Sequence, residues 1–206
     1  MKEKLIGTIC LTLAIIIFVT TGTSYAYFTA STTSSGSIDG ETADFEVSLD
    51  IEETYTATQL IPLEDSLIST AVKNNCIDKN RYQVCSLYKI TLTNTGTPQI
   101  LNGYIKSEEG TTYTTSNLRG QLFNSDLTSS VSTAIELSND GTKQYFKVDG
   151  SNMTTSEVSN TPVVYYLAIW LNETHSSQIE DYNKKFVGSV TFESINGNQI
   201  TSKFSA

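Results

Sequence analysis

The sequence predicts an all-β protein, folded as an antiparallel β-sandwich with one or two short helices. Residues 43–51, "ADFEVSLDI", alternate strictly between apolar and polar side chains, which is typical of a strand with one buried face. At least seven such segments are separated by turn signals, and strands do not alternate with helices as they would in a parallel sheet. The pattern fits a jelly-roll-like or an immunoglobulin-like strand order.

The expected strands follow one another along the whole chain. Residues 86–93 place Tyr88, Ile90 and Leu92 on one face and end in an Asn-Thr-Gly turn. Residues 163–171, "VVYYLAIWL", are apolar throughout, which indicates a central strand covered on both faces. Further strands are expected over residues 43–51, 100–105, 144–148, 184–194 and 199–206.

Helix is expected in two places at most. Residues 65–73, "DSLISTAVK", read as one short amphipathic helix with Asp65 or Ser66 as its cap. Residues 115–122 are expected to add another helical turn.

The N-terminal segment has the organisation of a secretory signal peptide. A basic start at residues 1–4 precedes fifteen mostly apolar residues, 5–19, a length that is short for a membrane span but usual for a signal. Ser24 and Ala26 place small side chains at the two positions that a signal peptidase must accommodate. We therefore expect residues 1–26 to be removed and the mature chain to begin at Tyr27. An uncleaved anchor is the other interpretation.

The mature chain is acidic. Removal of Lys2, Glu3 and Lys4 lowers the basic side chains from 13 to 11 and the acidic ones from 22 to 21, so the net charge becomes −10. This charge argues against nucleic acid and anionic lipid as partners, so membrane contact is expected only through the signal before cleavage. The composition suits a soluble protein that is exported from the cell.

Residues 27–42 are rich in Ser, Thr and Gly and are expected to form an N-terminal arm outside the sandwich domain, residues 43–206. The start of the arm combines aromatic and β-branched residues with no charge or proline, which is typical of a strand that can pair with the sheet edge of another subunit. Residues 34–36 would be a flexible joint. The alternatives are a disordered leader or a segment that folds back onto its own sheet. The proposed strand-donor residues are Tyr27, Phe28, Thr29, Ala30, Ser31, Thr32 and Thr33.

Cysteine usage indicates one disulfide. Cys10 is lost with the signal, which leaves Cys76 and Cys85 in "CIDKNRYQVC" as an even pair in an exported chain. Two free thiols, or metal ligation, are the other uses considered. Zinc sites usually pair cysteines at a shorter spacing.

No catalytic residue, metal ligand or cofactor is predicted. His175, the single histidine, lies in the polar stretch "NETHSSQ", and zinc hydrolysis would need further strong ligands of the kind that an HExxH motif supplies. Pairs such as Glu52-Glu53 point to opposite faces of a strand, so surface charge is a better interpretation than an acid/base dyad. The chain is therefore not expected to be an enzyme.

The apolar signal that ends in "TSYAYFTAST" resembles those of the camelysin/TasA-type biofilm matrix proteins of Gram-positive bacteria, which a dedicated signal peptidase processes. "YKITLTNTGT", "YYLAIWLNETHSSQ" and "KKFVGSVTFES" are also similar to strands of that family. The resemblance implies a secreted jelly-roll subunit that assembles with itself into extracellular fibres. The "CIDKNRYQVC" pair departs from the best-known members and leaves polymerisation open.

Three functions are compatible with these observations. The first is a structural subunit of matrix or surface fibres, with self-assembly and other matrix or surface proteins as partners. The second is a monomeric cell-surface or adhesive binding module. The third is a metallopeptidase, a label that the resemblance to camelysins carries without the residues that such chemistry needs.

Overall fold

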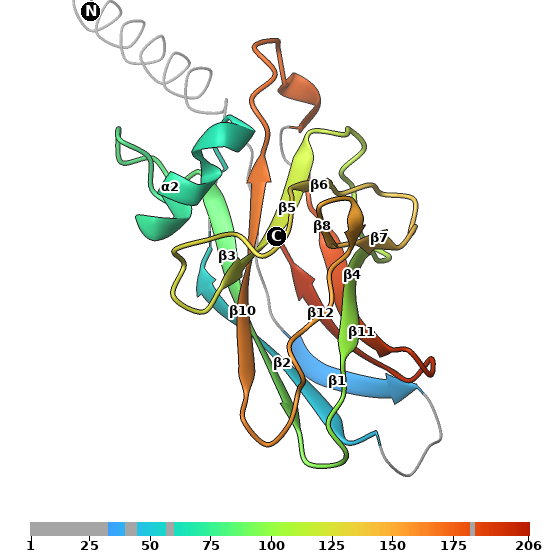
Figure 1. Cartoon of the computed structure of the whole chain (residues 1–206). Helices are drawn as coiled ribbons and strands as arrows, with labels where there is room; N and C mark the ends of the chain where they lie inside the picture. Colours follow the sequence, from blue (N-terminus) through green and yellow to red (C-terminus); the bar gives the residue numbers. More distant parts are fainter. Residues whose placement is uncertain (1–32, 40–44, 57–59, 182–183) are drawn as a thin grey trace, which may run out of the picture.

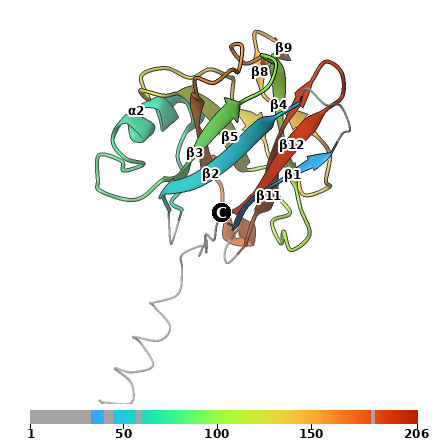
Figure 2. The same cartoon turned by 90° about the horizontal axis from the view of Figure 1, so that it is seen from below.

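The computed structural model describes residues 33–39, 45–56, 60–181 and 184–206, and these form two five-stranded antiparallel sheets packed face to face (Figure 1). The predicted all-β sandwich is therefore confirmed. We call the two layers sheet A and sheet B, and Figure 2 shows them side by side. In spatial order, sheet A contains β1 (Thr33–Asp39), β12 (Gln199–Ser205), β11 (Val187–Ser194), β4 (Leu101–Ser107) and β7 (Gln144–Tyr145). Sheet B contains β2 (Val47–Tyr55), β3 (Cys85–Asn94), β10 (Val163–Leu171), β5 (Leu118–Asn124) and β6 (Ile135–Glu136).

Short elements complete the described chain. The strands β8 (Lys147–Val148) and β9 (Ser151–Asn152) form a separate two-stranded ribbon. The helical segments are η1 (Asp65–Leu67), α2 (Ile68–Lys73) and η2 (Ile179–Asp181). Among the described residues, no helix is both long and apolar enough to span a bilayer.

The chain passes between the two sheets in the order of a jelly roll. Three connections stay within one sheet. The hairpin β2–β3 and the connection from β5 to β6 lie within sheet B, and the hairpin β11–β12 lies within sheet A. Every other connection between successive strands of the two large sheets crosses from one sheet to the other. If the hairpin β2–β3 and the hairpin β11–β12 are each counted as one strand, the ten strands of the two sheets reduce to eight. Their order is that of two Greek keys, which favours a jelly roll over an immunoglobulin-like topology.

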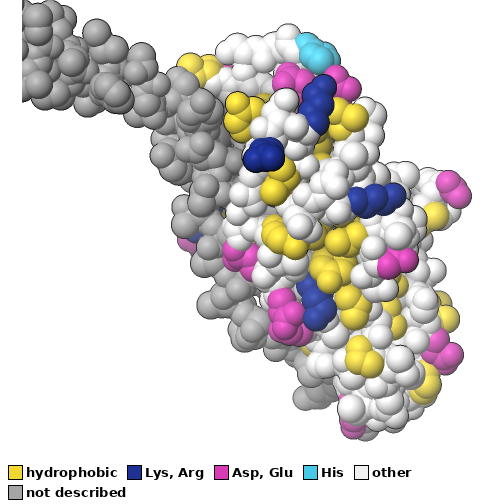
Figure 3. Space-filling model, turned by 90° about the vertical axis from the view of Figure 1, so that its left-hand side faces the viewer, with side chains coloured by type: hydrophobic (Ala, Val, Ile, Leu, Met, Phe, Trp, Pro, Cys, Tyr) yellow, Lys and Arg dark blue, Asp and Glu magenta, His cyan; other side chains and the backbone are white. Residues whose placement is uncertain are grey.

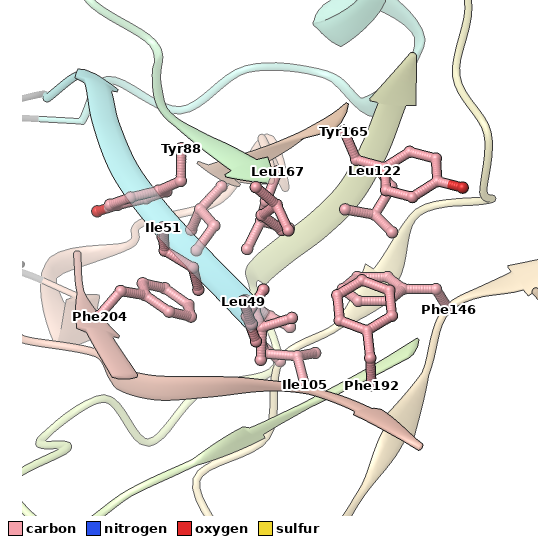
Figure 4. Close-up of a cluster of buried hydrophobic side chains, with 14 of the residues drawn as sticks. Leu49, Ile51, Tyr88, Ile105, Leu122, Phe146, Tyr165, Leu167, Phe192 and Phe204 are labelled. Carbon is pink, nitrogen blue, oxygen red and sulfur yellow. The ribbon is translucent and has the colours of Figure 1, made fainter. Parts of the chain in front are cut away.

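The core between the sheets is rich in aromatic side chains (Figure 4). Strand alternation sends Leu49 and Ile51 of β2 inward, where both are buried. Tyr88 of sheet B reaches across the sandwich, and its hydroxyl donates a 2.7 Å hydrogen bond to the Ser205 carbonyl oxygen. Phe192 of β11 lies parallel to Tyr165 of β10, with ring centroids 6.5 Å apart. These contacts join β3 to β12 and β10 to β11 across the core.

A second hydrophobic cluster lies on the outer face of sheet B. Residues 60–84, which we call the cap, connect β2 to β3 and carry η1 and α2. The cap packs Ile68 and Val72 against the outward side chains of β10, including Trp170. The Trp170 indole Nε1 donates to Asp65 Oδ1 at 2.9 Å. Strand β10 is therefore covered on both faces, by the main core and by the cap, as its apolar sequence predicted.

The predicted disulfide is confirmed. Cys76, which follows α2 within the cap, is bonded to Cys85, the first residue of β3. Both cysteines are fully buried, so the bridge ties the cap to the sheet from within the second cluster.

Three predictions about local structure were wrong. Asp65 or Ser66 was expected to cap one helix over residues 65–73, but η1 and α2 follow one another there and neither has a side-chain cap hydrogen bond. Residues 115–122 were expected to add a helical turn, but Leu118–Asn124 form β5 in sheet B. The strand was missed because one of its inward positions is a glycine, Gly120, so the sequence lacks an apolar side chain there. A Cβ atom at this position would approach the Leu137 side chain to 3.1 Å. The arm, residues 27–42, was expected to lie outside the sandwich, but Thr33–Asp39 form β1 at the edge of sheet A.

Candidate functional site

The N-terminal strand β1 is an edge strand with an interrupted ladder. Ser37, Ile38 and Asp39 face Thr201, Ile200 and Gln199 of β12, and Thr33 faces Lys203, with a register shift in between. β1 carries no charged residue before Asp39. β1 therefore lacks the charged side chains that protect an edge strand from pairing with another chain, although its register shift is itself a protective feature.

The other edge on this side of the sandwich has a different character. Strand β2 forms the edge of sheet B, and the side chains of Asp50, Glu52 and Glu53 are exposed along it. Lys89 of the neighbouring strand neutralises part of this charge through a 3.1 Å contact with Glu52. Charged side chains on an edge strand oppose pairing with a further strand, so the two edges differ in their readiness to bind one.

A gap in sheet B opens at the start of its central strand. β10 pairs with β3 from Val163 onward, whereas its pairing with β5 begins only at Tyr165, opposite Asn124. β5 leaves the sheet there because Asn124 closes a turn, its side chain accepting hydrogen bonds from the backbone N–H groups of Thr128 and Ser129. We call this place, at Val163 and Val164, the β10 notch.

A hollow of about 470 Å³ lies at the β10 notch, within the size range of ligand pockets. Its apolar lining includes Val131, Met153 and Val163, and its polar lining includes Asn124 and Ser156. Every described residue that lines the hollow is uncharged, although 17% of the chain is charged. The hollow therefore suits an uncharged occupant with an apolar side chain.

Tyr165 forms part of the wall of the hollow. One face of its ring lies parallel to Phe192, and its hydroxyl points away from the labelled core side chains (Figure 4). Burial raises the pKa of Tyr165, although the backbone N–H of Ser156 acts in the opposite direction. The hydroxyl therefore stays protonated at neutral pH and can donate a hydrogen bond.

The sequence-predicted site residues fall in two groups. Thr33 lies in β1, and Cys76 and Cys85 form the disulfide. The cleavage residues Ser24, Ala26 and Tyr27 lie outside the described residues, as do the strand-donor residues from Phe28 to Thr32. The notch and its hollow were missed by sequence analysis because no sequence signal marks the point where one strand of a pair ends before the other.

His175 does not form part of a metal site in the described chain. Its side chain is 75% exposed, with Nε2 3.8 Å from Glu64 Oε1, and it lies beside acidic groups at one end of the molecule (Figure 3). Across the described residues, no group of three or more His, Cys, Asp or Glu side chains could hold a metal ion.

Glu108 makes the outer face of sheet A sensitive to acid. Its carboxylate accepts a 2.7 Å hydrogen bond from Ser189 and lies 3.2 Å from Lys106 Nζ and 3.4 Å from Lys203 Nζ. Burial alone would raise the pKa of Glu108, but the hydrogen bonds from Ser189 and Lys106 and the two ammonium charges outweigh it and lower the pKa below 4.5. The ionised carboxylate therefore stabilises the fold above its unfolded-state pKa, and this contribution is lost as the pH falls through the folded-state pKa.

The change Glu108→Gln is expected to lower the free energy of unfolding at neutral pH by about 1 kcal/mol, because the lysines are partly exposed and screened. The difference from the wild-type protein should disappear as the pH falls through the folded-state pKa of Glu108. Urea unfolding over this pH range measures it, with the exposed neighbour Glu109→Gln as the control. If Glu108→Gln lowers the free energy of unfolding by the same amount at neutral and at acidic pH, the ionised carboxylate of Glu108 is not what stabilises the fold.

Comparison of the chain with protein-family profiles, with curated proteins and with solved structures finds no match.

Proposed function

We propose that this protein is a secreted structural subunit of extracellular matrix or surface fibres, in which the N-terminal segment of one copy pairs with a sheet of the next. The observation that carries the proposal is the contrast between the two edges on one side of the sandwich. The edge at β1 is uncharged from Thr33 to Ile38, whereas the edge at β2 presents Asp50, Glu52 and Glu53. A protein that must avoid all edge-to-edge pairing protects both edges.

The composition of the segment before β1 supports the same function. Residues 27–32, "YFTAST", contain no charge and no proline, which is favourable for an added strand. Before cleavage, this segment is joined through residues 20–26 to the apolar residues 5–19 of the signal. Cleavage by a signal peptidase after Ala26 would release it for pairing outside the cell. The proposal needs no cofactor and no catalytic residue.

Deletion of residues 27–36 is expected to abolish filament formation, because it removes the donated segment together with the first half of β1. Purified mature protein that starts at Tyr27 and the deletion variant are compared at rising concentration by light scattering and negative-stain microscopy. We expect filaments from the first and monomers from the second.

The control is a mature chain of full length with Ile195→Ser, a change at a position that is 94% exposed in the turn between β11 and β12. Circular dichroism must show that both variants are folded. Filaments that form equally well without residues 27–36 would refute strand donation. A mature chain that stays monodisperse at every concentration would favour the monomeric cell-surface or adhesive binding module instead.

A further inference from the structure

Part of the cap carries positive charge on an acidic protein. Residues 68–84 contain three basic side chains and one acidic side chain, a net charge of +2, whereas the whole chain carries −9, so the rest carries −11. The basic side chains are those of Lys73, Lys79 and Arg81, and all three are exposed. Figure 3 views the molecule from the side on which Figure 1 places α2, and it shows Lys and Arg side chains among hydrophobic ones. Contact with an anionic partner is therefore favoured on this surface.

The three cations have no carboxylate partner in the described chain. Asp78, the acidic residue of this region, is occupied within its own loop, because its Oδ1 accepts the backbone N–H groups of Asn80 and Tyr82, both at 2.8 Å. No ion pair joins any of the three cations to a described carboxylate. Ion pairs do hold basic side chains elsewhere, namely those of Lys89, Lys106, Arg119, Lys143 and Lys203.

A fixed loop presents two of these cations. Residues 77–83, which we call the cap loop, begin and end at an antiparallel bridge between Ile77 and Gln83. Within the loop, the Asp78 N–H donates to the Tyr82 carbonyl oxygen at 2.9 Å. The disulfide closes the chain just outside the bridge. The loop is therefore ordered before a ligand binds, which lowers the entropy cost of binding.

An exposed aromatic ring lies next to the cations in the cap loop. Tyr82 is 53% exposed, and the other described aromatic side chains are buried or half-buried. The ring offers an apolar face on which a sugar ring can lie, and its hydroxyl can bond to sugar hydroxyls. Arg81, its neighbour in sequence, carries a planar fork of N–H donors that matches a carboxylate. The loop thus combines the two contacts that a charged sugar polymer needs.

We propose that the cap loop and Lys73 bind an acidic polysaccharide, with a sugar ring against Tyr82 and the sugar carboxylates paired with Lys73, Lys79 and Arg81. Lys73 lies six residues before Lys79, so their backbones are at most about 20 Å apart and one polymer chain can contact both. The inference goes beyond the proposed function and needs no strand donation. The cap lies on the outer face of sheet B, whereas β1 belongs to sheet A, so filaments and monomers alike present this surface.

Fluorescence anisotropy tests this binding on the mature chain, held at a concentration where light scattering shows monomers. The probe is an end-labelled oligogalacturonate, and an end-labelled oligoglutamate with the same number of carboxylates is the comparison without sugar rings. The test variant combines Lys79→Gln with Arg81→Gln. The matched control combines Lys147→Gln with Lys185→Gln, which removes the same charge from two exposed lysines that also lack an ion pair in the described chain. A third variant, Tyr82→Ser, removes the ring, and circular dichroism must show that every variant is folded.

We expect saturable binding of oligogalacturonate to the wild-type chain, at least about tenfold weaker binding to the test variant, and binding within about twofold of wild type for the control. Tyr82→Ser should weaken binding of oligogalacturonate at least about threefold and leave binding of oligoglutamate unchanged. The proposal is overturned if oligogalacturonate does not bind saturably, or if both double variants lose affinity equally, since net charge alone then explains binding. Equally tight binding of oligoglutamate, or no effect of Tyr82→Ser, shows that the surface does not recognise sugar and also overturns it.

Discussion

Truncation of Phe192 to alanine is expected to lower the free energy of unfolding by about 3 to 5 kcal/mol. Phe192 is fully buried between the sheets. Its ring lies against Tyr165 of the opposite sheet and directly over Gly103, where an added Cβ atom would be only 2.9 Å from Phe192 Cε1. The surrounding side chains come from both sheets, so they cannot close the cavity without shifting β4 or β10.

Urea unfolding followed by circular dichroism measures this loss. The control is Ile195→Ala in the next turn, where the side chain is 94% exposed, and its effect should stay within about 0.5 kcal/mol. A loss below about 1 kcal/mol for Phe192→Ala would show that this region of the core repacks, contrary to the tight contact with Gly103.

Removal of the disulfide by the double change Cys76→Ala and Cys85→Ala is expected to cost about 2 to 3 kcal/mol. The bridge joins residues nine positions apart, and a closed loop of this length restricts the unfolded chain by about that amount. The loss should lower the melting temperature by about 5 to 10 °C. The shape of the hollow at the β10 notch should be unaffected, because none of its lining residues belongs to the cap.

Differential scanning calorimetry measures the melting temperatures. Lys73→Ala, an exposed position at the end of α2, is the control for changes in the cap that leave the bridge intact. If the double variant melts with the wild-type protein, packing of Ile68 and Val72 alone holds the cap. Alkylation of both thiols in freshly isolated wild-type protein would show that the bridge does not form.

The fold class could be predicted from the sequence because the order of apolar and polar residues in most strands matches their burial. The alternation over residues 43–51 corresponds to β2, where Val47, Leu49 and Ile51 are buried between exposed residues. The uniform apolar run at residues 163–171 corresponds to β10, and both of its faces are covered. The end of β2 could not be predicted, because Glu52 and Glu53 are both exposed in the strand and the alternation stops before the backbone pairing does.

Only part of the candidate site could be predicted from the sequence. An even pair of cysteines was enough to suggest a bridge. The partner strand of a segment such as Thr33–Asp39, in contrast, depends on which edge remains open after the sheets have formed. The β10 notch depends on the different ends of two neighbouring ladders, at Val163 and at Tyr165. Such a difference is a property of tertiary register, and neither strand's sequence contains it.

The position of Trp170 gives the protein a built-in optical reporter. It is the single tryptophan of the chain, and it lies beneath the cap with its indole N–H bonded to Asp65. Its fluorescence therefore reports on the outer face of sheet B, whereas tyrosines such as Tyr88 and Tyr165 lie in the core between the sheets. Selective excitation of Trp170 can therefore follow detachment of the cap, while circular dichroism follows the loss of the sheets, as two distinct events in the same sample.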